Sequence, residues 1–346
     1  MLETRSSRAV ALLVAAASLI GLIALVVFVG HEPTPQDDDL IYEKMAQHPF
    51  APHTYVFAYR VAVPWLVHVL PFSTDVSFAG LGFLMSAAAG GCMVLLLEQL
   101  GTTRRVAVLL SLTFALSPPL LTAALRLGRN PDPMTLLVMT AGTLFIVQRR
   151  AVPLALTMFA GAFNRESSLF LAPLAYALWA VRPVDRGALR RTIAVTAPAL
   201  IAFVTLRLAI PTVGPGYGSV AGGRLDLLRT AAHQAGTLAR RLATVYGPLW
   251  LVAPLALREF RFARRGLVLV PLCLIAFTFA LDWGRVAAIG APVVYGAAGW
   301  VLTRRPRLVL PTAIGCVVLV LGYAIYMRYV GLDHLLDARS VPYPVR

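Results

Sequence analysis

The sequence predicts an all-α polytopic membrane protein with about eleven transmembrane helices. Two observations carry this prediction. First, the 346 residues are 58% hydrophobic and only 14% charged, with a mean hydropathy of +0.75, whereas soluble domains carry about 25% charged residues. Second, apolar stretches of roughly 16 to 22 residues recur along the whole chain, as repeated membrane-spanning helices require. A third observation, the sidedness of the charges between these stretches, gives the orientation.

The spans follow from the apolar stretches between polar breaks. The first, 9–30, is too long for the apolar core of a signal peptide, and no small-residue cleavage site precedes Glu32. We therefore expect it to be retained as a helix. The expected spans are approximately 9–30, 76–97, 106–124, 133–148, 151–163, 168–181, 192–211, 242–257, 266–281, 286–302 and 308–328.

Two long polar segments separate these spans. The first, 31–75, contains the apolar stretch 54–72, which is interrupted by charged and proline residues, so we expect interfacial helices lying along the membrane here. A twelfth span over this stretch is the alternative. The second, 212–241, starts with a glycine-rich hinge and continues as an amphipathic helix. No separate soluble domain is expected, so 1–346 is a single transmembrane domain.

The charges between the spans give the orientation. Short arginine-rich loops alternate with segments that collect the acidic residues and all six histidines. Because short cytoplasmic loops carry an excess of arginine and lysine, this pattern puts the N-terminus in the cytoplasm and the C-terminus outside. The segments 31–75 and 212–241 then lie on the outer face.

Several classes of protein are excluded. The three cysteines fall in expected spans without metal-like spacing, so neither a disulfide framework nor a zinc site is expected. No P-loop or dinucleotide-binding glycine pattern occurs, so no nucleotide cofactor is expected. The net charge of +15 is spread in short clusters rather than a continuous basic stripe, so we expect no nucleic-acid partner.

Charged residues also occur at turns on the outer side, where topology does not require them. They occur in YRVAVP (59–64), RLGRNPDP (126–133), NRESS (164–168) and LDWGR (281–285). Charges at the ends of spans usually face a bundle interior or an aqueous cavity, so four such turns on one side predict a polar cavity there. The alternative is a set of neutralised interfacial ion pairs, with arginines reaching toward lipid headgroups.

These turns supply candidate ligands for a lipid phosphate. Arginine presents a planar fork of N–H donors that suits phosphate oxygens. The candidate phosphate ligands are Arg60, Arg129, Arg165 and Arg285. Neighbouring side chains are candidates for contact with an acceptor or a metal, and we expect Asp282 to pair with Arg285; this second group comprises Tyr42, Asp132, Glu166 and Asp282.

A short motif follows the first span. Asp38, Asp39, Tyr42 and Ala46 form the pattern D-D-x-x-Y-x-x-x-A, and the i, i+4 spacing puts Asp38, Tyr42 and Ala46 on one face of a helix. This motif, with YRVAVP and the overall layout, resembles the class C (GT-C) glycosyltransferases, integral membrane enzymes that use polyprenyl-phosphate sugars. The chain is similar to small bacterial members of that family.

The motif also departs from the family pattern. The second acid of the pair is Asp39 rather than glutamate, and Asp37 is additional. The chain lacks the large soluble outer domain of the oligosaccharyltransferases, so protein glycosylation of that kind is not expected. The resemblance is specific only over residues 38 to 64.

The resemblance implies a glycosyltransferase, either a hexosyl- or a pentosyltransferase, in the bacterial inner membrane. It would move a sugar from a polyprenyl-phosphate donor to a cell-envelope glycan or lipid acceptor on the outer face. Asp38 would accept the proton of the acceptor hydroxyl, with Asp39 positioning the acceptor or assisting a metal. A divalent cation, Mg²⁺ or Mn²⁺, is left open as a cofactor. Besides the donor and acceptor, membrane lipids are the expected partners.

Other interpretations stay open. The three aspartates 37–39 also suit a helix N-terminus, where they would cap and stabilise it, and the sequence does not decide which of them is the base. A flippase or transporter for a lipid-linked intermediate would share the arginine-lined cavity, but we find neither internal repeats nor paired broken helices. A non-catalytic partner in envelope synthesis is a third interpretation.

Overall fold

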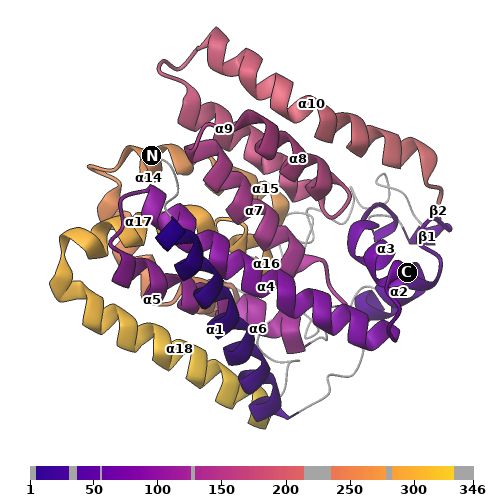
Figure 1. Ribbon diagram of the computed structural model, residues 1–346, viewed down its shortest axis with the longest axis horizontal. Coiled ribbons are helices and arrows are strands. Elements are labelled where there is room, and N and C mark those ends of the chain that lie inside the picture. Colours follow the sequence, from indigo (N-terminus) through magenta and orange to yellow (C-terminus); the bar gives the residue numbers. More distant parts are fainter. Residues whose placement is uncertain are drawn as a thin grey trace.

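The computed structural model describes residues 5–30, 37–54, 57–125, 129–213, 235–277 and 283–330. Within these ranges the chain is helical apart from one pair of very short strands (Figure 1). The α-helices are α1 (Arg5–Val29), α2 (Asp37–Gln47), α3 (Ala62–Val69), α4 (Thr74–Gln99), α5 (Arg104–Ala115), α6 (Pro118–Leu125), α7 (Asp132–Val147), α8 (Ala151–Ala162), α9 (Leu171–Trp179), α10 (Arg186–Ala209), α12 (Ala235–Tyr246), α13 (Leu249–Val252), α14 (Arg261–Gly266), α15 (Leu269–Phe277), α16 (Trp283–Ala288), α17 (Ala291–Arg304) and α18 (Val309–Val330).

Short elements complete the fold. Four 3-10 turns connect helices, and two-residue strands β1 and β2 pair in parallel, with His53 opposite Thr212 and Thr54 opposite Val213. The bounds of these elements are η1 (Phe57–Tyr59), η2 (Glu166–Phe170), η3 (Ala253–Ala256), η4 (Pro306–Leu308), β1 (His53–Thr54) and β2 (Thr212–Val213).

Four described helices are long and apolar enough to cross a membrane: α1, α4, α10 and the continuous segment Pro306–Tyr329. A fifth is added if α5 and α6, which meet at a bend of 40°, count as one broken span. The expected number of eleven is therefore not reached in the described part of the chain. The helical character is confirmed, and a membrane-crossing length is confirmed for four or five of the expected spans.

The shortfall has a physical cause. At a rise of 1.5 Å per residue, a helix needs about 20 residues to cross the hydrocarbon core, and α7 and α8 have 16 and 12 residues. Prolines divide other apolar stretches, because proline cannot donate the helical hydrogen bond. Pro118 and Pro119 begin α6 after the break that ends α5, and the expected span 242–257 is divided into α12, α13 and η3 around Pro248 and Pro254.

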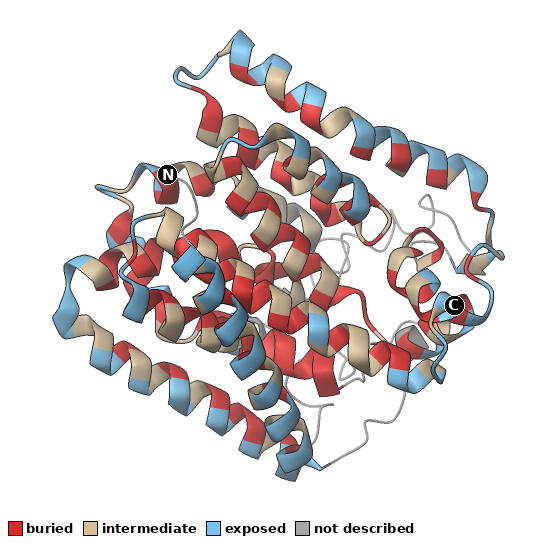
Figure 2. Ribbon diagram, in the orientation of Figure 1, coloured by how far each residue is buried: buried red, intermediate tan, exposed pale blue. Residues whose placement is uncertain are grey.

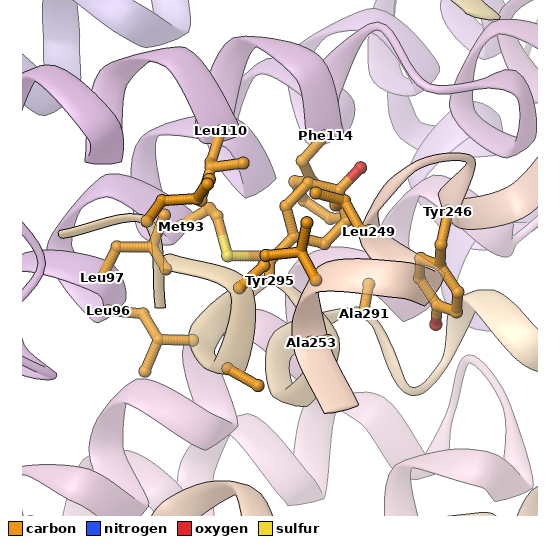
Figure 3. Close-up of a cluster of buried hydrophobic side chains, with 14 of the residues drawn as sticks. Met93, Leu96, Leu97, Leu110, Phe114, Tyr246, Leu249, Ala253, Ala291 and Tyr295 are labelled. Carbon is orange, nitrogen blue, oxygen red and sulfur yellow. The ribbon is translucent and has the colours of Figure 1, made fainter. Parts of the chain in front are cut away.

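The centre of the bundle is packed from helices distant in sequence. Met93, Leu96 and Leu97 of α4 meet Leu110 and Phe114 of α5, together with Leu249 and Tyr295 (Figure 3). Small residues let α4 approach α1 closely, since a Cβ added at Gly91 would lie 3.0 Å from the carbonyl oxygen of Ala11. This close packing holds α4 in place, and the first turn of α4 carries Asp75, a partner of Arg129.

The outer helices expose many large apolar side chains. Figure 2 shows exposed residues along α1, α10 and α18 at the edges of the bundle, and large apolar residues are among them, including Leu12, Leu208 and Leu310. Long apolar helices with exposed apolar faces are suited to lipid rather than water. The structure is thus that of a helical protein with several helices able to cross a membrane.

The described parts of the first long segment, 37–54 and 57–75, lie together at one end of the bundle (Figure 1). Tyr42, Met45 and Ala46 of α2 are buried in a cluster with Val63 and Val67 of α3. Within the stretch 54–72 the structure has η1 and the eight-residue helix α3, so the stretch contains a short helix but forms neither one continuous helix nor a twelfth span. The Ala62 N–H donates to the carbonyl of Phe163 at 2.9 Å, which ties this unit to the end of α8.

The second long segment, 212–241, is described only at its ends. β2 begins it and α12 begins at Ala235. The expected hinge and most of the expected amphipathic helix, 214–234, lie outside the described residues, as does the tail 331–346.

Candidate functional site

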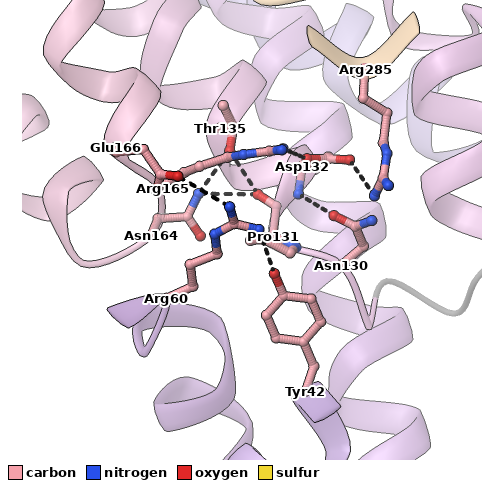
Figure 4. A network of polar contacts seen from close by, with 10 residues as sticks. All are labelled: Tyr42, Arg60, Asn130, Pro131, Asp132, Thr135, Asn164, Arg165, Glu166 and Arg285. Carbon is pink, nitrogen blue, oxygen red and sulfur yellow. Dashed lines mark hydrogen bonds and ion pairs between the residues drawn. The ribbon is translucent and has the colours of Figure 1, made fainter. Parts of the chain in front are cut away.

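Five charged side chains from four separate segments meet at the end of the bundle that carries α2 and α3 (Figure 4). Arg60 lies between η1 and α3, and Asp132 is the first residue of α7. Arg165 lies between α8 and η2, Glu166 is the first residue of η2, and Arg285 comes from α16. Except for Arg129, the arginines that the sequence proposed as phosphate ligands are brought together here.

Asp132 is the centre of this arrangement. Its Oδ1 accepts a hydrogen bond from Arg165 Nη1, and its Oδ2 accepts from Arg285 Nη1 at 3.2 Å. The side chains of Asp132, Arg165 and Arg285 are 8%, 13% and 15% exposed. Two guanidinium groups therefore share one carboxylate in a largely buried place, where charge pairs are hardly screened by water.

Arg60 forms a second branch. Its Nη2 donates to Glu166 Oε1 and its Nη1 to the Tyr42 hydroxyl, both at 3.2 Å, and its guanidinium lies 5.4 Å from the centroid of the Phe57 ring. Burial by itself would lower the pKa of Arg60, but the Tyr42 oxygen and the Glu166 carboxylate outweigh it and hold this pKa above its usual range. Arg60 therefore stays protonated.

Glu166 is the acid of this branch. Burial opposes its ionisation, but the positive charges of Arg60 and Arg165 prevail and lower the pKa of Glu166 to about 2. It is thus ionised at neutral pH. A carboxylate with so low a pKa is a weak proton acceptor, so Glu166 is better suited to orienting a hydroxyl or a cation than to acting as a base.

Two asparagines and a threonine, not selected from the sequence, hold the turns in place. Asn164 Nδ2 donates to the Pro131 carbonyl at 3.1 Å and to Thr135 Oγ1 at 2.9 Å. The Asn130 side chain accepts from the Asp132 N–H at 3.0 Å. Both asparagines occur in the quoted turns RLGRNPDP and NRESS, next to the charged residues. This position beside the charges is the sequence signal that could have identified them.

Arg129 lies apart from the Asp132 network. Its Nη2 donates to Asp75 Oδ1 in the first turn of α4, and its Nη1 lies 3.5 Å from Glu43 Oε2 of α2. We expected Arg129 to act with the other three arginines, and Glu43 was not among the expected site residues. The structure brings three of the four expected arginines together and gives Arg129 two different acidic partners.

The acidic pair of the motif lies in the first turn of α2, and α2 has the helical form that the spacing required. Asp39 is buried, on the face that also buries Tyr42 and Ala46. The side chains of Asp37 and Asp38 lie outside the described residues, and the role of Asp38 as base stays a prediction. Asp282 also lies outside them, and its expected pairing with Arg285 stays a prediction.

A small cavity lies against Asp132, Arg165 and Arg285. It has room for about one water molecule, so a phosphate group would enter only if the arginines move apart from Asp132. The remaining wall is apolar except for one hydroxyl; these residues are Pro119, Thr135, Leu136 and Ala288.

Metal ligands are not grouped in the part of the chain that the structure describes, where no set of three or more histidine, cysteine, aspartate or glutamate side chains is placed to hold a cation. His53 Nε2 and His68 Nδ1 instead make hydrogen-bond contacts with the backbone carbonyls of His48 and Ala46, at 2.8 and 2.9 Å. The expectation of a divalent cation stays open.

No protein-family model matches the chain, and no curated protein sequence matches it significantly. The resemblance to class C glycosyltransferases therefore rests on the residues quoted above and on the layout of the chain.

Proposed function

We propose that this protein is a membrane glycosyltransferase that moves a sugar from a polyprenyl-phosphate donor to a glycan or lipid acceptor of the cell envelope. One observation carries the proposal: Arg60, Arg165 and Arg285 gather with Asp132 and Glu166 next to the helix that bears the three aspartates. A lipid phosphate needs clustered donors at a membrane-facing depth. An acceptor hydroxyl needs a carboxylate nearby.

The proposed reaction is a single displacement. The acceptor hydroxyl oxygen bonds to the anomeric carbon of the sugar, and the bond from that carbon to the phosphate oxygen breaks. Its electron pair leaves with the phosphate, and the hydroxyl proton passes to a carboxylate. Asp38 is the proposed base and Asp39 the proposed acceptor-positioning residue. One displacement inverts the anomeric carbon, and the phosphate leaves without needing a protonating acid of the kind glycosidases use.

The chemistry of arginine supports the proposed binding of the phosphate that leaves. A guanidinium carries five N–H donors in a planar fork, and Asp132 accepts from only one nitrogen of Arg165. When a phosphate arrives, the two arginines that share Asp132 would turn toward its oxygens and stabilise the charge that develops on them. Asp132 keeps both guanidinium groups at the site before the donor binds.

The proposed setting is the bacterial inner membrane, with the N-terminus in the cytoplasm and the site on the outer face. The arginine-rich short loops support this orientation through the positive-inside rule. A divalent cation, Mg²⁺ or Mn²⁺, is retained as an optional cofactor that Glu166 or Asp39 would help to bind.

Transfer by the purified protein tests the proposal. The full chain in lipid nanodiscs would be incubated with radiolabelled polyprenyl-phosphate sugars and an envelope lipid extract, with and without Mg²⁺. We expect labelled acceptor with the wild type and with Glu259→Gln, a control carboxylate exposed in a loop, and none with Asp38→Asn. Full transfer by the Asp38→Asn protein would remove Asp38 as the base. Donor binding without transfer by the wild type would favour a carrier of lipid-linked intermediates.

A further inference from the structure

The four arginines that the sequence treated as equivalent have two different environments. Arg165 and Arg285 line the cavity and share Asp132. Arg60 and Arg129 do not line it, and each contacts α2 instead. This difference in contacts suggests a division of roles.

Neighbouring residues of α2 contact two arginines from distant parts of the chain. The Tyr42 hydroxyl accepts from Arg60 Nη1 at 3.2 Å, and Glu43 Oε2 lies 3.5 Å from Arg129 Nη1. The side chains of Arg60 and Arg129 are each only 11% exposed. The helix is thus held at two points by cations that are themselves largely buried.

Each of these arginines also contacts a carboxylate outside α2 through its other terminal nitrogen. Arg60 Nη2 donates to Glu166, and Arg129 Nη2 donates to Asp75. Both terminal nitrogens of each guanidinium are therefore engaged. The remaining Nε of each is buried without a hydrogen-bond partner among the described residues, out of reach of a ligand at the surface.

The rest of α2 is packed around these two contacts. The Tyr42 ring lies edge-on to Phe57 with centroids 5.6 Å apart, and His68 of α3 contacts the Ala46 carbonyl at 2.9 Å. The aspartates 37–39 stand one turn before Tyr42 on the same helix. Whatever fixes Tyr42 and Glu43 therefore also fixes the turn that carries the proposed base.

We propose that Arg60 and Arg129 are positioning residues that dock α2 on the bundle, and that Arg165 and Arg285 alone contact the lipid phosphate. This division rests on the proposed function for the roles of Asp38 and of the phosphate, whereas the docking of α2 does not depend on it. The positioning pair acts on the reaction through the place of α2, and the cavity pair acts on the donor directly.

Hydrogen exchange and ligand binding on the full chain in nanodiscs separate the two roles. The first measurement is amide exchange over 37–47. The second is binding of a long-chain polyprenyl monophosphate without sugar. The docking variants are Arg129→Gln and the milder Tyr42→Phe, which removes only a hydroxyl; the cavity variants are Arg165→Gln and Arg285→Gln; the control is Arg105→Gln, an exposed arginine at the start of α5.

We expect the docking variants to speed exchange of α2 by about tenfold or more, the effect of losing a hydrogen bond to a charged group. Their lipid-phosphate affinity should stay within about twofold of the wild type. The cavity variants should lose about tenfold or more in affinity, with unchanged exchange of α2. In transfer assays, the docking variants should lower kcat while KM for the donor is unchanged.

Two results would overturn the division. One is a loss of lipid-phosphate affinity in Arg129→Gln as large as in Arg165→Gln. The other is exchange of α2 that neither docking variant changes. If the wild type binds no polyprenyl monophosphate, the proposed function fails together with the role of Arg165 and Arg285, and the exchange data still decide whether Arg129 and Tyr42 dock α2. If Arg129→Gln does not fold, Tyr42→Phe still tests the docking of α2 through its contact with Arg60.

Discussion

Replacing Asp132 by asparagine is the sharpest test of the charged network. The substitution keeps the size of the side chain and one acceptor oxygen, but removes the negative charge that two guanidinium groups share. It also turns an N–H₂ group toward one of those cations. Because all three side chains are 15% exposed or less, solvent would not replace the lost charge.

The expected cost follows from this burial. At 3.2 Å between Arg285 Nη1 and Asp132 Oδ2, the attraction of one pair is about 5 kcal/mol at an effective dielectric constant of about 20. Desolvation of both ions cancels part of this. Removing one partner of a buried pair typically costs about 3–5 kcal/mol, and we expect Asp132→Asn to lower the free energy of unfolding by that amount.

Denaturant unfolding in detergent micelles, followed by tryptophan fluorescence, measures this change. The matched control is Asp75→Asn, which also removes a carboxylate bonded to an arginine but at a side chain that is 60% exposed. That variant should lose less than about 1 kcal/mol. A cycle of Asp132→Asn, Arg165→Gln and the double variant should show about 1–3 kcal/mol of coupling. A cost of Asp132→Asn no larger than that of Asp75→Asn, or additive single variants, would refute the reasoning.

Three further predictions concern the same region and the helix ends. Glu166→Gln should lower the free energy of unfolding by about 1 kcal/mol at neutral pH, since the Glu166 side chain is 36% exposed. Folding lowers the pKa of Glu166 from 4.5 to about 2, so the stability difference between wild type and Glu166→Gln should be complete above pH 4.5 and shrink as the pH falls toward 2. Unfolding of both proteins between pH 2 and 7 measures this difference. A difference that grows on acidification would contradict the prediction. Asn164→Ala should cost about 1–3 kcal/mol, because two hydrogen bonds that join the α7 and α8 ends disappear; unchanged micelle unfolding would show that these bonds do not hold the turns. Gly247→Ala should lower the free energy of unfolding by more than about 1 kcal/mol, because φ of Gly247 is 49° and the new Cβ would lie 2.6 Å from Leu319 Cδ2. The control is Gly80→Ala in α4, where nothing lies within 4 Å of the new Cβ. It should be neutral or stabilising in the same assay.

The candidate site was predictable in its residue types but only partly in its pairing. The turns YRVAVP, NRESS and LDWGR do supply Arg60, Arg165 and Arg285 to one network. Nothing along the chain separates Arg129 from them, because Arg129 is closer to Asp132 in sequence than Arg60 is. Its partners Glu43 and Asp75 lie 86 and 54 residues away, and only the path of α2 and α4 through space brings them to it.

The helical character and the positions of the long spans follow from the local sequence of each segment. The runs 9–30, 76–97, 192–211 and 308–328 correspond to α1, α4, α10 and Pro306–Tyr329, because a long apolar run is a local property that each segment carries alone. Tertiary structure alone decided how the shorter apolar stretches break and which acid meets which arginine. Proline lacks the N–H of a helical hydrogen bond, and whether a helix breaks there depends on whether neighbouring helices supply partners for the freed backbone groups. The pairings join segments that no periodicity along the chain connects.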